Sequence, residues 1–182
     1  MIEPSDRVKI WNSFFKLAWT EAKSLHERST GISSAKVFDP LGGTLGEVEI
    51  HTLATMVLCN LAIETRANHL IDEMIEEGKI TQSEGEAARW LLTRHKWFLL
   101  PKLDGINAKL DKASGPHQAV VQICSLRNDL MHVNYTDLQK QLPKPDTALS
   151  LFAKFIEAME DMNVLLGRHD KPQKEVLELS KF

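Results

Sequence analysis

Apolar residues recur at steps of three and four along most of the chain, and this spacing constrains the fold more than any other feature of the sequence. It gathers apolar side chains on one face of an α-helix, whereas a half-buried strand would alternate apolar and polar residues. The first apolar stripe consists of Val8, Trp11, Phe14, Phe15, Ala18, Trp19, Ala22 and Leu25. Because strand-like alternation is rare, we predict an all-α protein.

Helix start and stop signals divide this pattern into about five main helices. Thr44 with Glu47, and Thr81 with Glu84, have the capping-box spacing that begins a helix, and Gly78 is expected to end the second helix. The expected helices cover 4–27, 44–77, a short segment after Thr81 that carries Ala87, Trp90 and Leu91, 116–134, and 146 or 147 to 166.

Two connections are expected to be irregular. Residues 28–46 are rich in Gly, Ser and Thr and predict a loop, and Pro101 and Gly105 interrupt 95–107, which should mix helical turns with loop. A length of 182 residues predicts a single domain, 1–182, in which 168–182 forms a tail.

Charge and cysteine content exclude several classes of protein. With 22 Lys and Arg against 25 Asp and Glu, the net charge of −3 provides no overall attraction to nucleic acid or an anionic membrane, so any RNA contact must be local. Cys59 and Cys124 lack CxxC spacing, lie on apolar helix faces and indicate core positions in a reducing compartment. Without an apolar leader or an apolar window of about 18 residues, we expect a soluble cytoplasmic protein.

The sequence lacks the common motifs of metal, nucleotide and nucleophile sites, and this favours a reaction that needs no metal and no cofactor. HExxH, zinc-ligand spacing, a GxSxG elbow and a Gly-Lys-Ser/Thr phosphate loop are all absent. The glycines of GGTLG, residues 42–46, are expected to serve backbone turning.

The segment HQAVVQICSLRNDLMHVNY, residues 117–135, is the most informative. At about 100° per residue its apolar side chains cover most of the helix circumference, which predicts a helix surrounded by other elements. Arg127 falls near the middle of the apolar arc and His132 at its edge. Because a buried guanidinium cannot lose its charge, Arg127 must meet a carboxylate such as Glu64, a ligand phosphate, or a cleft between subunits.

LRNDLMH, with Arg127, Asn128 directly after it and His132 after four intervening residues, resembles the Arg-x4–6-His signature of HEPN domains. The preceding LAIETRANHLIDEM, the intervening KWFLLPKL and a long following helix agree with the resemblance, which covers about 47–167. It implies an α-helical bundle that dimerises. Many such domains are metal-independent endoribonucleases, often toxins with a separate antitoxin or components of phage defence, and others are non-catalytic modules that bind a nucleotide, nucleic acid or protein.

For this chain the resemblance implies that His132 is a general base on a ribose 2′-hydroxyl and that Arg127 stabilises the phosphorane-like transition state. Asn128 would orient the imidazole or bind a phosphate oxygen, and Asp129 would either hold one tautomer of His132 or be an exposed acid. Arg127 and His132 are separated by about 140° of helix rotation. A symmetric dimer that brings two copies of each residue to a shared cleft would solve this.

Two further groups complete the candidate site. Glu64, together with Arg66 and Asn68, interrupts the second apolar stripe and is the best candidate partner of Arg127, with the alternative that these polar residues serve helix packing. Arg94, Lys96 and Trp97 belong to the only cluster of basic and aromatic residues and could contact RNA, with the alternative that the aromatics are core and the basic residues solvated. His69 and His117 are expected at the surface.

Overall fold

Six helices and no strand make up the described part of the chain, residues 4–30, 46–131 and 141–168 of a computed structural model. The helices are α1 (Pro4–Thr30), α2 (Glu47–Glu76), α3 (Gln82–Arg89), α4 (Thr93–Leu103), α5 (Gly115–Met131) and α7 (Pro145–Leu165). The predicted all-α class is confirmed. His132 and most of the expected loop 28–46 lie outside the described residues, as do the side chains of 4–9 and Met131.

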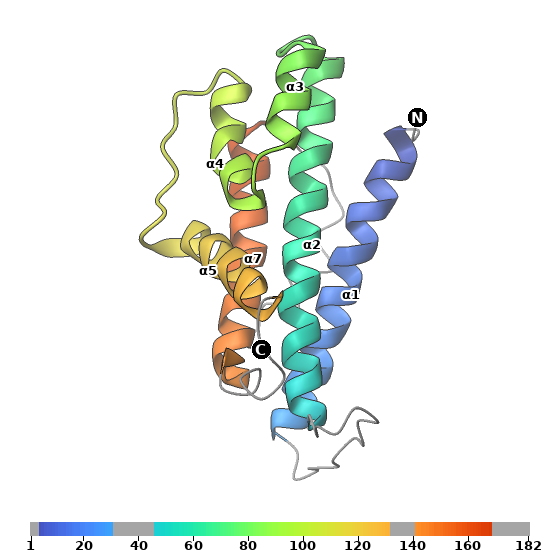
Figure 1. Ribbon diagram of the computed structural model, residues 1–182, viewed down its shortest axis with the longest axis vertical. Coiled ribbons are helices and arrows are strands. Elements are labelled where there is room, and N and C mark those ends of the chain that lie inside the picture. Colours follow the sequence, from blue (N-terminus) through green and yellow to red (C-terminus); the bar gives the residue numbers. More distant parts are fainter. Residues whose placement is uncertain (1–3, 31–45, 132–140, 169–182) are drawn as a thin grey trace.

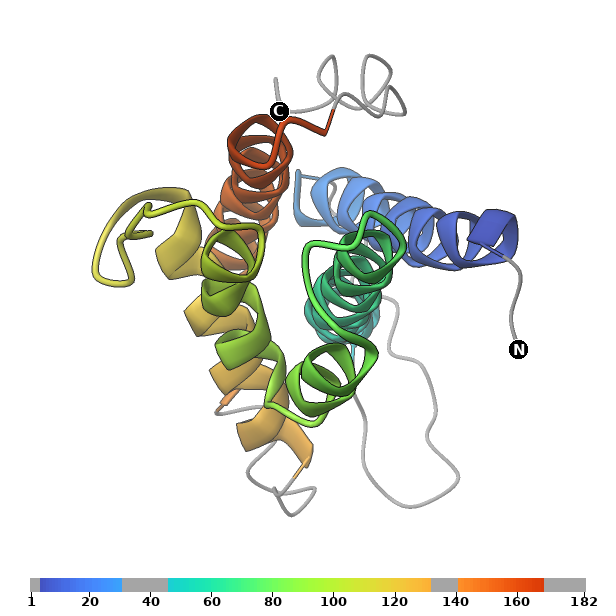
Figure 2. The same cartoon turned by 90° about the horizontal axis from the view of Figure 1, so that it is seen from above.

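The central helix is α2, which packs against all five of the other helices. Figure 1 shows α1, α2 and α7 along the long axis of the molecule, with α5 crossing obliquely. Seen from above, α1 lies on one side of α2, and α4, α5 and α7 lie on the other (Figure 2). Residues far apart in sequence, 47–76 and 115–131, are thereby brought into contact.

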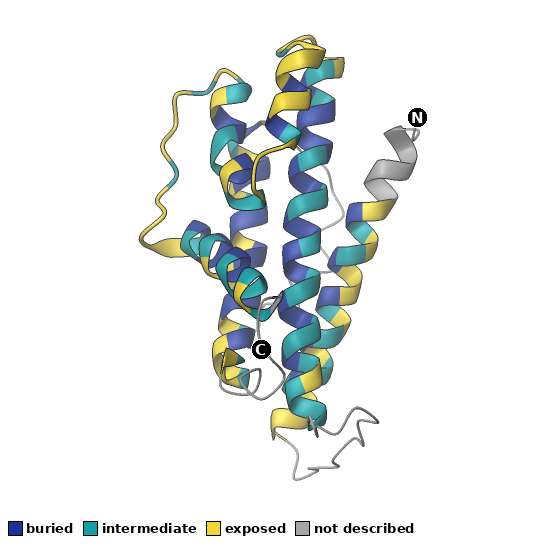
Figure 3. Cartoon of the chain, viewed as in Figure 1, coloured by how far each residue is buried: buried dark blue, intermediate teal, exposed yellow. Residues whose placement is uncertain are grey.

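The apolar stripes meet around α2 in one hydrophobic core. Trp11, Phe15, Ala18, Ala22 and Leu25 of the first stripe are buried, and so are both cysteines, which confirms these predictions. Along most of its length α2 is buried or partly buried, whereas α3 and the connection from α4 to α5 are largely exposed (Figure 3). The core therefore fixes α2, and the shorter helices are docked around it.

Several predicted helix ends are confirmed by their capping groups. The α2 helix ends at Glu76, and Gly78 follows with a φ of 70°, a left-handed conformation that favours glycine. Thr81 accepts the Glu84 backbone N–H and Glu84 returns the bond, so the capping box is formed. The start of α7 at Pro145, which has no side-chain cap, is one or two residues before the predicted start at Asp146 or Thr147.

Other predicted boundaries are wrong. Residues 28–30 continue α1 rather than beginning a loop, because the Thr30 hydroxyl donates to the His26 carbonyl and Arg28 pairs with Glu47 of α2. The N-cap of α2 is Gly46, and Thr44 lies outside the described residues. Trp90 and Leu91 lie beyond the end of α3.

The expected break at Pro101 is also wrong, since α4 runs through this residue to Leu103. Pro101 lies in the last turn, where its missing N–H removes a single helical hydrogen bond and its buried ring packs in the core. The helix ends near Gly105, whose φ of 79° reverses the chain. None of the described helices is long and apolar enough to cross a membrane.

Candidate functional site

A pocket of about 280 Å³ lies between α2, the α3–α4 junction and α5. Its apolar lining consists of Leu61, Leu91, Leu92 and Cys124. Its polar lining consists of Asn60 and Glu64 of α2, Arg89, Thr93, Arg94 and Lys96 of α3 and α4, and Arg127 and Asn128 of α5. We call this the α2–α5 pocket. It brings together five residues that the sequence proposed separately, namely Glu64, Arg94, Lys96, Arg127 and Asn128.

The last turns of α5 supply Arg127 and Asn128. The Arg127 side chain is half-buried, and its Nη1 donates a hydrogen bond of 3.1 Å to Oδ1 of Asn128. Asp129, the next residue, is exposed and does not line the pocket. His132 lies outside the described residues, so the structure does not place it relative to Arg127.

Glu64 is held in the pocket by α4 and not by Arg127. The Lys96 ammonium forms an ion pair with Glu64 Oε1, and the Thr93 hydroxyl donates to Glu64 Oε2. Lys96 Nζ also donates to Oδ1 of Asn68 at 3.0 Å. Of the two predicted roles of Glu64, the structure therefore supports the contact between packed helices and not the pairing with Arg127, because the ammonium of Lys96, which is only 2 % exposed, takes that carboxylate.

Of the remaining cationic side chains that line the pocket, one has a carboxylate partner and two do not. Arg89 forms an ion pair with Asp72 of α2. By contrast, no carboxylate among the described residues forms an ion pair with Arg94 or Arg127. Because Lys96 and Glu64 cancel, the pocket keeps two guanidinium groups whose charge is not neutralised by this part of the chain. Such an arrangement favours an anion with several oxygens.

Cys124 lines the pocket, and the charges around it affect the pKa of its thiol. Burial raises the pKa of its thiol to about 12, and the nearby Glu64 carboxylate acts in the same direction, while Arg94 and Arg127 oppose it. The thiol is therefore protonated at neutral pH and is not a nucleophile. Burial likewise raises the pKa of Cys59.

Two of the predicted RNA contacts need correction. Trp97 is fully buried, and its Nε1 donates to Nδ1 of His117 at 3.2 Å, so no face of its ring is open to a nucleobase. Lys96 lines the pocket, but its ammonium is buried against Glu64 and Asn68 and holds that pair together. Arg94 is half-buried at the pocket and stays a candidate for contacting RNA.

Asn60 and Thr93 line the pocket but were not predicted as site residues. Asn60 lies one helical turn before Glu64, so the shared face of α2 was a signal that could have found it. Thr93 is the first residue of α4 and follows the three-residue connection from α3, so no pattern in the sequence relates it to α2. Only the packing of α4 on α2 brings its hydroxyl to Glu64.

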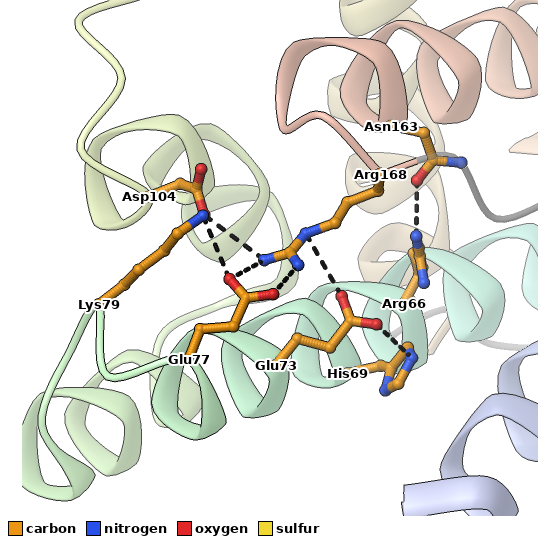
Figure 4. Close-up of polar contacts among 8 residues, drawn as sticks. All are labelled: Arg66, His69, Glu73, Glu77, Lys79, Asp104, Asn163 and Arg168. Atoms are coloured by element: carbon orange, nitrogen blue, oxygen red, sulfur yellow. Dashed lines mark hydrogen bonds and ion pairs between the residues drawn. The ribbon is translucent and has the colours of Figure 1, made fainter.

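A second polar cluster ties together α2, the end of α4 and the end of α7 (Figure 4). Arg168 forms ion pairs with Glu73, Glu77 and Asp104, and Lys79 joins Asp104 at 2.6 Å. Hydrogen bonds from Arg168 lower the pKa of the Glu77 carboxyl to about 2. Every charged group in this cluster faces an opposite charge, so its geometry accounts for helix docking without a ligand.

The buried side chains beside this cluster are structural. Arg66 donates to Oδ1 of Asn163 at 2.7 Å and lies 4.9 Å from the centre of the Trp11 ring. His69 and His117 are buried rather than at the surface, because His69 faces Glu73 at 3.1 Å and His117 packs on Trp97. Arg66 thus joins α1, α2 and α7.

No group of three or more His, Cys, Asp or Glu side chains that could hold a metal ion is found in the described residues. No family model, curated protein or solved structure with which the chain was compared matches it. The geometry of the α2–α5 pocket is therefore the main guide to function.

Proposed function

We propose that the chain is a metal-independent endoribonuclease of the HEPN type, with the α2–α5 pocket holding the scissile phosphate. The observation that carries the proposal is the pair of guanidiniums, Arg94 from α4 and Arg127 from α5, that line one pocket without a carboxylate partner among the described residues. A phosphodiester has two non-bridging oxygens, and a guanidinium donates to both at once.

In the proposed reaction the ribose 2′-oxygen is the nucleophile. His132 takes the proton of the 2′-hydroxyl as the oxygen attacks the adjacent phosphorus. The new bond from O2′ to phosphorus forms while the bond to the 5′-oxygen of the next nucleotide breaks, and that oxygen receives the proton that the imidazole took from the 2′-hydroxyl. The products are a 2′,3′-cyclic phosphate and a 5′-hydroxyl. Arg127 stabilises the charge that develops on the phosphoryl oxygens, and Asn128 orients Arg127 through their hydrogen bond.

A symmetric dimer is part of the proposal. His132 follows the last described residue of α5 and is five positions after Arg127, about 140° around a helix. Two copies would bring Arg127 of one and His132 of the other to a shared cleft. Size exclusion with light scattering at micromolar concentration tests this, with a dimer expected and a monomer contradicting the composite site.

The biological role that accompanies this activity is that of a toxin or defence ribonuclease restrained by a separate antitoxin protein. Expression of an active ribonuclease in cells should stop their growth. Arrest that His132→Ala relieves, at equal protein level, supports this role. Unimpaired growth with the wild-type protein, in cells that lack any antitoxin, contradicts it.

A second candidate is a non-catalytic module that binds a nucleotide or nucleic acid in the same pocket. It is favoured by one observation, that the only carboxylate lining the pocket in the described residues, Glu64, is bound by Lys96 and Thr93. Both oxygens of this carboxylate are therefore already engaged by side chains of α4. This candidate predicts binding that depends on Arg94 and Arg127 but no cleavage.

Cleavage of labelled RNA by the purified protein in excess EDTA separates the two candidates. The endoribonuclease predicts cleavage that Arg127→Ala and His132→Ala each reduce by at least about a hundredfold. Arg28→Ala is the matched control, since Arg28 is an exposed arginine paired with Glu47 away from the pocket. Binding of RNA without cleavage by a folded wild-type protein would favour the binding module.

A further inference from the structure

Trp90 is the most exposed large apolar side chain in the described residues, with 90 % of its surface open. The other tryptophans with described side chains are buried or half-buried. Leu92, two residues later, is 57 % exposed. An exposed tryptophan costs free energy because about 200 Å² of apolar surface stays in water, and such residues are enriched where a partner is bound.

The backbone that carries Trp90 is well fixed. At the end of α3 the Leu91 N–H donates to the Ala88 carbonyl at 3.2 Å. The Leu92 carbonyl then accepts the N–H groups of the first turn of α4. The backbone of the three-residue junction is thus hydrogen-bonded at both ends.

Close packing of α3 on α2 holds this turn in place. Arg89, next to Trp90, forms an ion pair with Asp72 of α2. A Cβ atom on Gly85 would lie 2.3 Å from Cδ1 of Ile75, so the absent side chain lets the two helices approach. The backbone at Trp90 is therefore positioned by packing on α2, the same helix that contributes Glu64 to the pocket.

The junction adjoins the α2–α5 pocket, because the residues on both sides of Trp90, Arg89 and Leu91, line it. The backbone of Trp90 therefore lies at the edge of the pocket that holds the guanidiniums of Arg94 and Arg127, and its indole is open to solvent. This combination decides the occupant. An apolar protein surface would match the ring but not the two charges, whereas a nucleotide supplies both an aromatic base and an anionic phosphate.

We propose that Trp90 is a base-stacking residue that receives an unpaired nucleobase next to a phosphate bound in the α2–α5 pocket. The inference rests on the proposed function insofar as the pocket takes nucleic acid, but it does not require cleavage. A base inside a duplex has both faces covered, so stacking on Trp90 selects a strand with at least one unpaired nucleotide. Trp90 therefore takes the role that the sequence analysis gave to Trp97.

Binding is measured with a fluorescein-labelled, 2′-O-methylated RNA decanucleotide of mixed sequence, which lacks the 2′-hydroxyl and cannot be cleaved by the proposed reaction. Trp90→Ala should raise the Kd at least about fivefold, and Trp90→Phe, which keeps an aromatic face, should restore most of the affinity. Val164→Ala is the control, because Val164 is 75 % exposed on α7 and does not line the pocket. Leu92→Ala removes the other exposed apolar side chain of the junction and should raise the Kd less than Trp90→Ala does.

Tryptophan fluorescence distinguishes base stacking on Trp90 from a purely structural role of this residue. Stacking should quench the emission of the wild-type protein when the unlabelled strand is added, and the quenching should be lost in Trp90→Phe although the strand still binds. A blunt duplex of the same sequence should bind more weakly than the single strand at equal salt.

The possible failures are distinguishable. Equal affinity of wild type and Trp90→Ala for the strand overturns the stacking role and leaves the proposed function standing. A wild-type protein that binds no strand, but is folded, overturns both. If Trp90→Ala instead converts a dimer into a monomer in light scattering, Trp90 belongs to an interface between copies of the chain and the inference is overturned.

Discussion

The Lys96 ammonium and the Glu64 carboxylate form an ion pair inside the α2–α5 pocket, and this pair joins α4 to α2 across 32 positions of sequence. Its two members differ in exposure, with the Lys96 side chain at 2 % and the Glu64 side chain at 29 %. Because Glu64 is the only carboxylate lining the pocket in the described residues, its neutralisation by Lys96 leaves the pocket positive.

Breaking the pair from either side should have unequal effects on stability. Glu64→Gln leaves the deeply buried Lys96 charge without its counterion and should lower the free energy of unfolding by roughly 1–3 kcal/mol, whereas Lys96→Met leaves a half-exposed carboxylate and should cost less. Urea unfolding of the two single variants and the double variant measures this. The double variant should lose less than the sum of the singles, and strict additivity would show that the two groups do not interact.

An anion bound by Arg94 and Arg127 should raise the thermal stability of the protein. Tripolyphosphate at millimolar concentration should raise the Tm of the wild-type protein, because a ligand bound only by the folded state stabilises it. Arg94→Gln and Arg127→Gln should each reduce the rise, and Lys154→Gln, an exposed change on α7 outside the pocket, should not. Equal rises in all four proteins would show that the anion binds elsewhere.

His117 should make the protein less stable as the pH falls. Burial lowers the pKa of His117 in the folded chain, although Asp161 of α7 opposes this, while the unfolded residue keeps its ordinary value of about 6.5. The unfolded state therefore binds more protons below about pH 6.5, and stability is lost as the pH falls through that value toward the folded pKa. Protonation of Nδ1 would also remove the hydrogen bond from Trp97.

The check is the difference in free energy of unfolding between pH 7 and pH 5, measured for wild type and for His117→Asn, which keeps an acceptor near Trp97. The variant should show a smaller difference than the wild type. If both proteins lose the same amount of stability, His117 does not contribute to the pH dependence.

Both cysteines should resist alkylation in the native protein. Cys124 is buried at the pocket wall with its thiol pKa raised to about 12, so almost no thiolate exists at pH 8. Iodoacetamide at pH 8 should label neither Cys59 nor Cys124 before unfolding and both in urea, as read by mass spectrometry. Rapid native labelling of Cys124 would indicate that the pocket opens more widely than described.

The helices were predictable wherever one apolar face repeats over many turns. The stripe from Trp11 to Leu25 meets α2. The position of Arg127 on the apolar face of α5 already indicated that its guanidinium needs a carboxylate, a phosphate or a cleft. Two short-range outcomes were not predictable. Trp90 and Trp97 lie in one basic and aromatic segment, and only the packing of α4 buries Trp97 and leaves Trp90 exposed. The partner of Glu64 was likewise decided by the docking of α4, which presents Lys96 closer than Arg127.

The central claim is that the α2–α5 pocket supports attack by a ribose 2′-oxygen on the phosphate bound by Arg127. The most direct test begins with the main site at which the wild-type protein cuts an RNA in excess EDTA. The same RNA is then made with a 2′-O-methyl group at the nucleotide 5′ to that site alone. We expect cleavage to stop at this site, to continue at others, and to leave 2′,3′-cyclic phosphate ends. Continued cleavage at the methylated nucleotide, or no cleavage of any RNA by the folded protein, would contradict this claim.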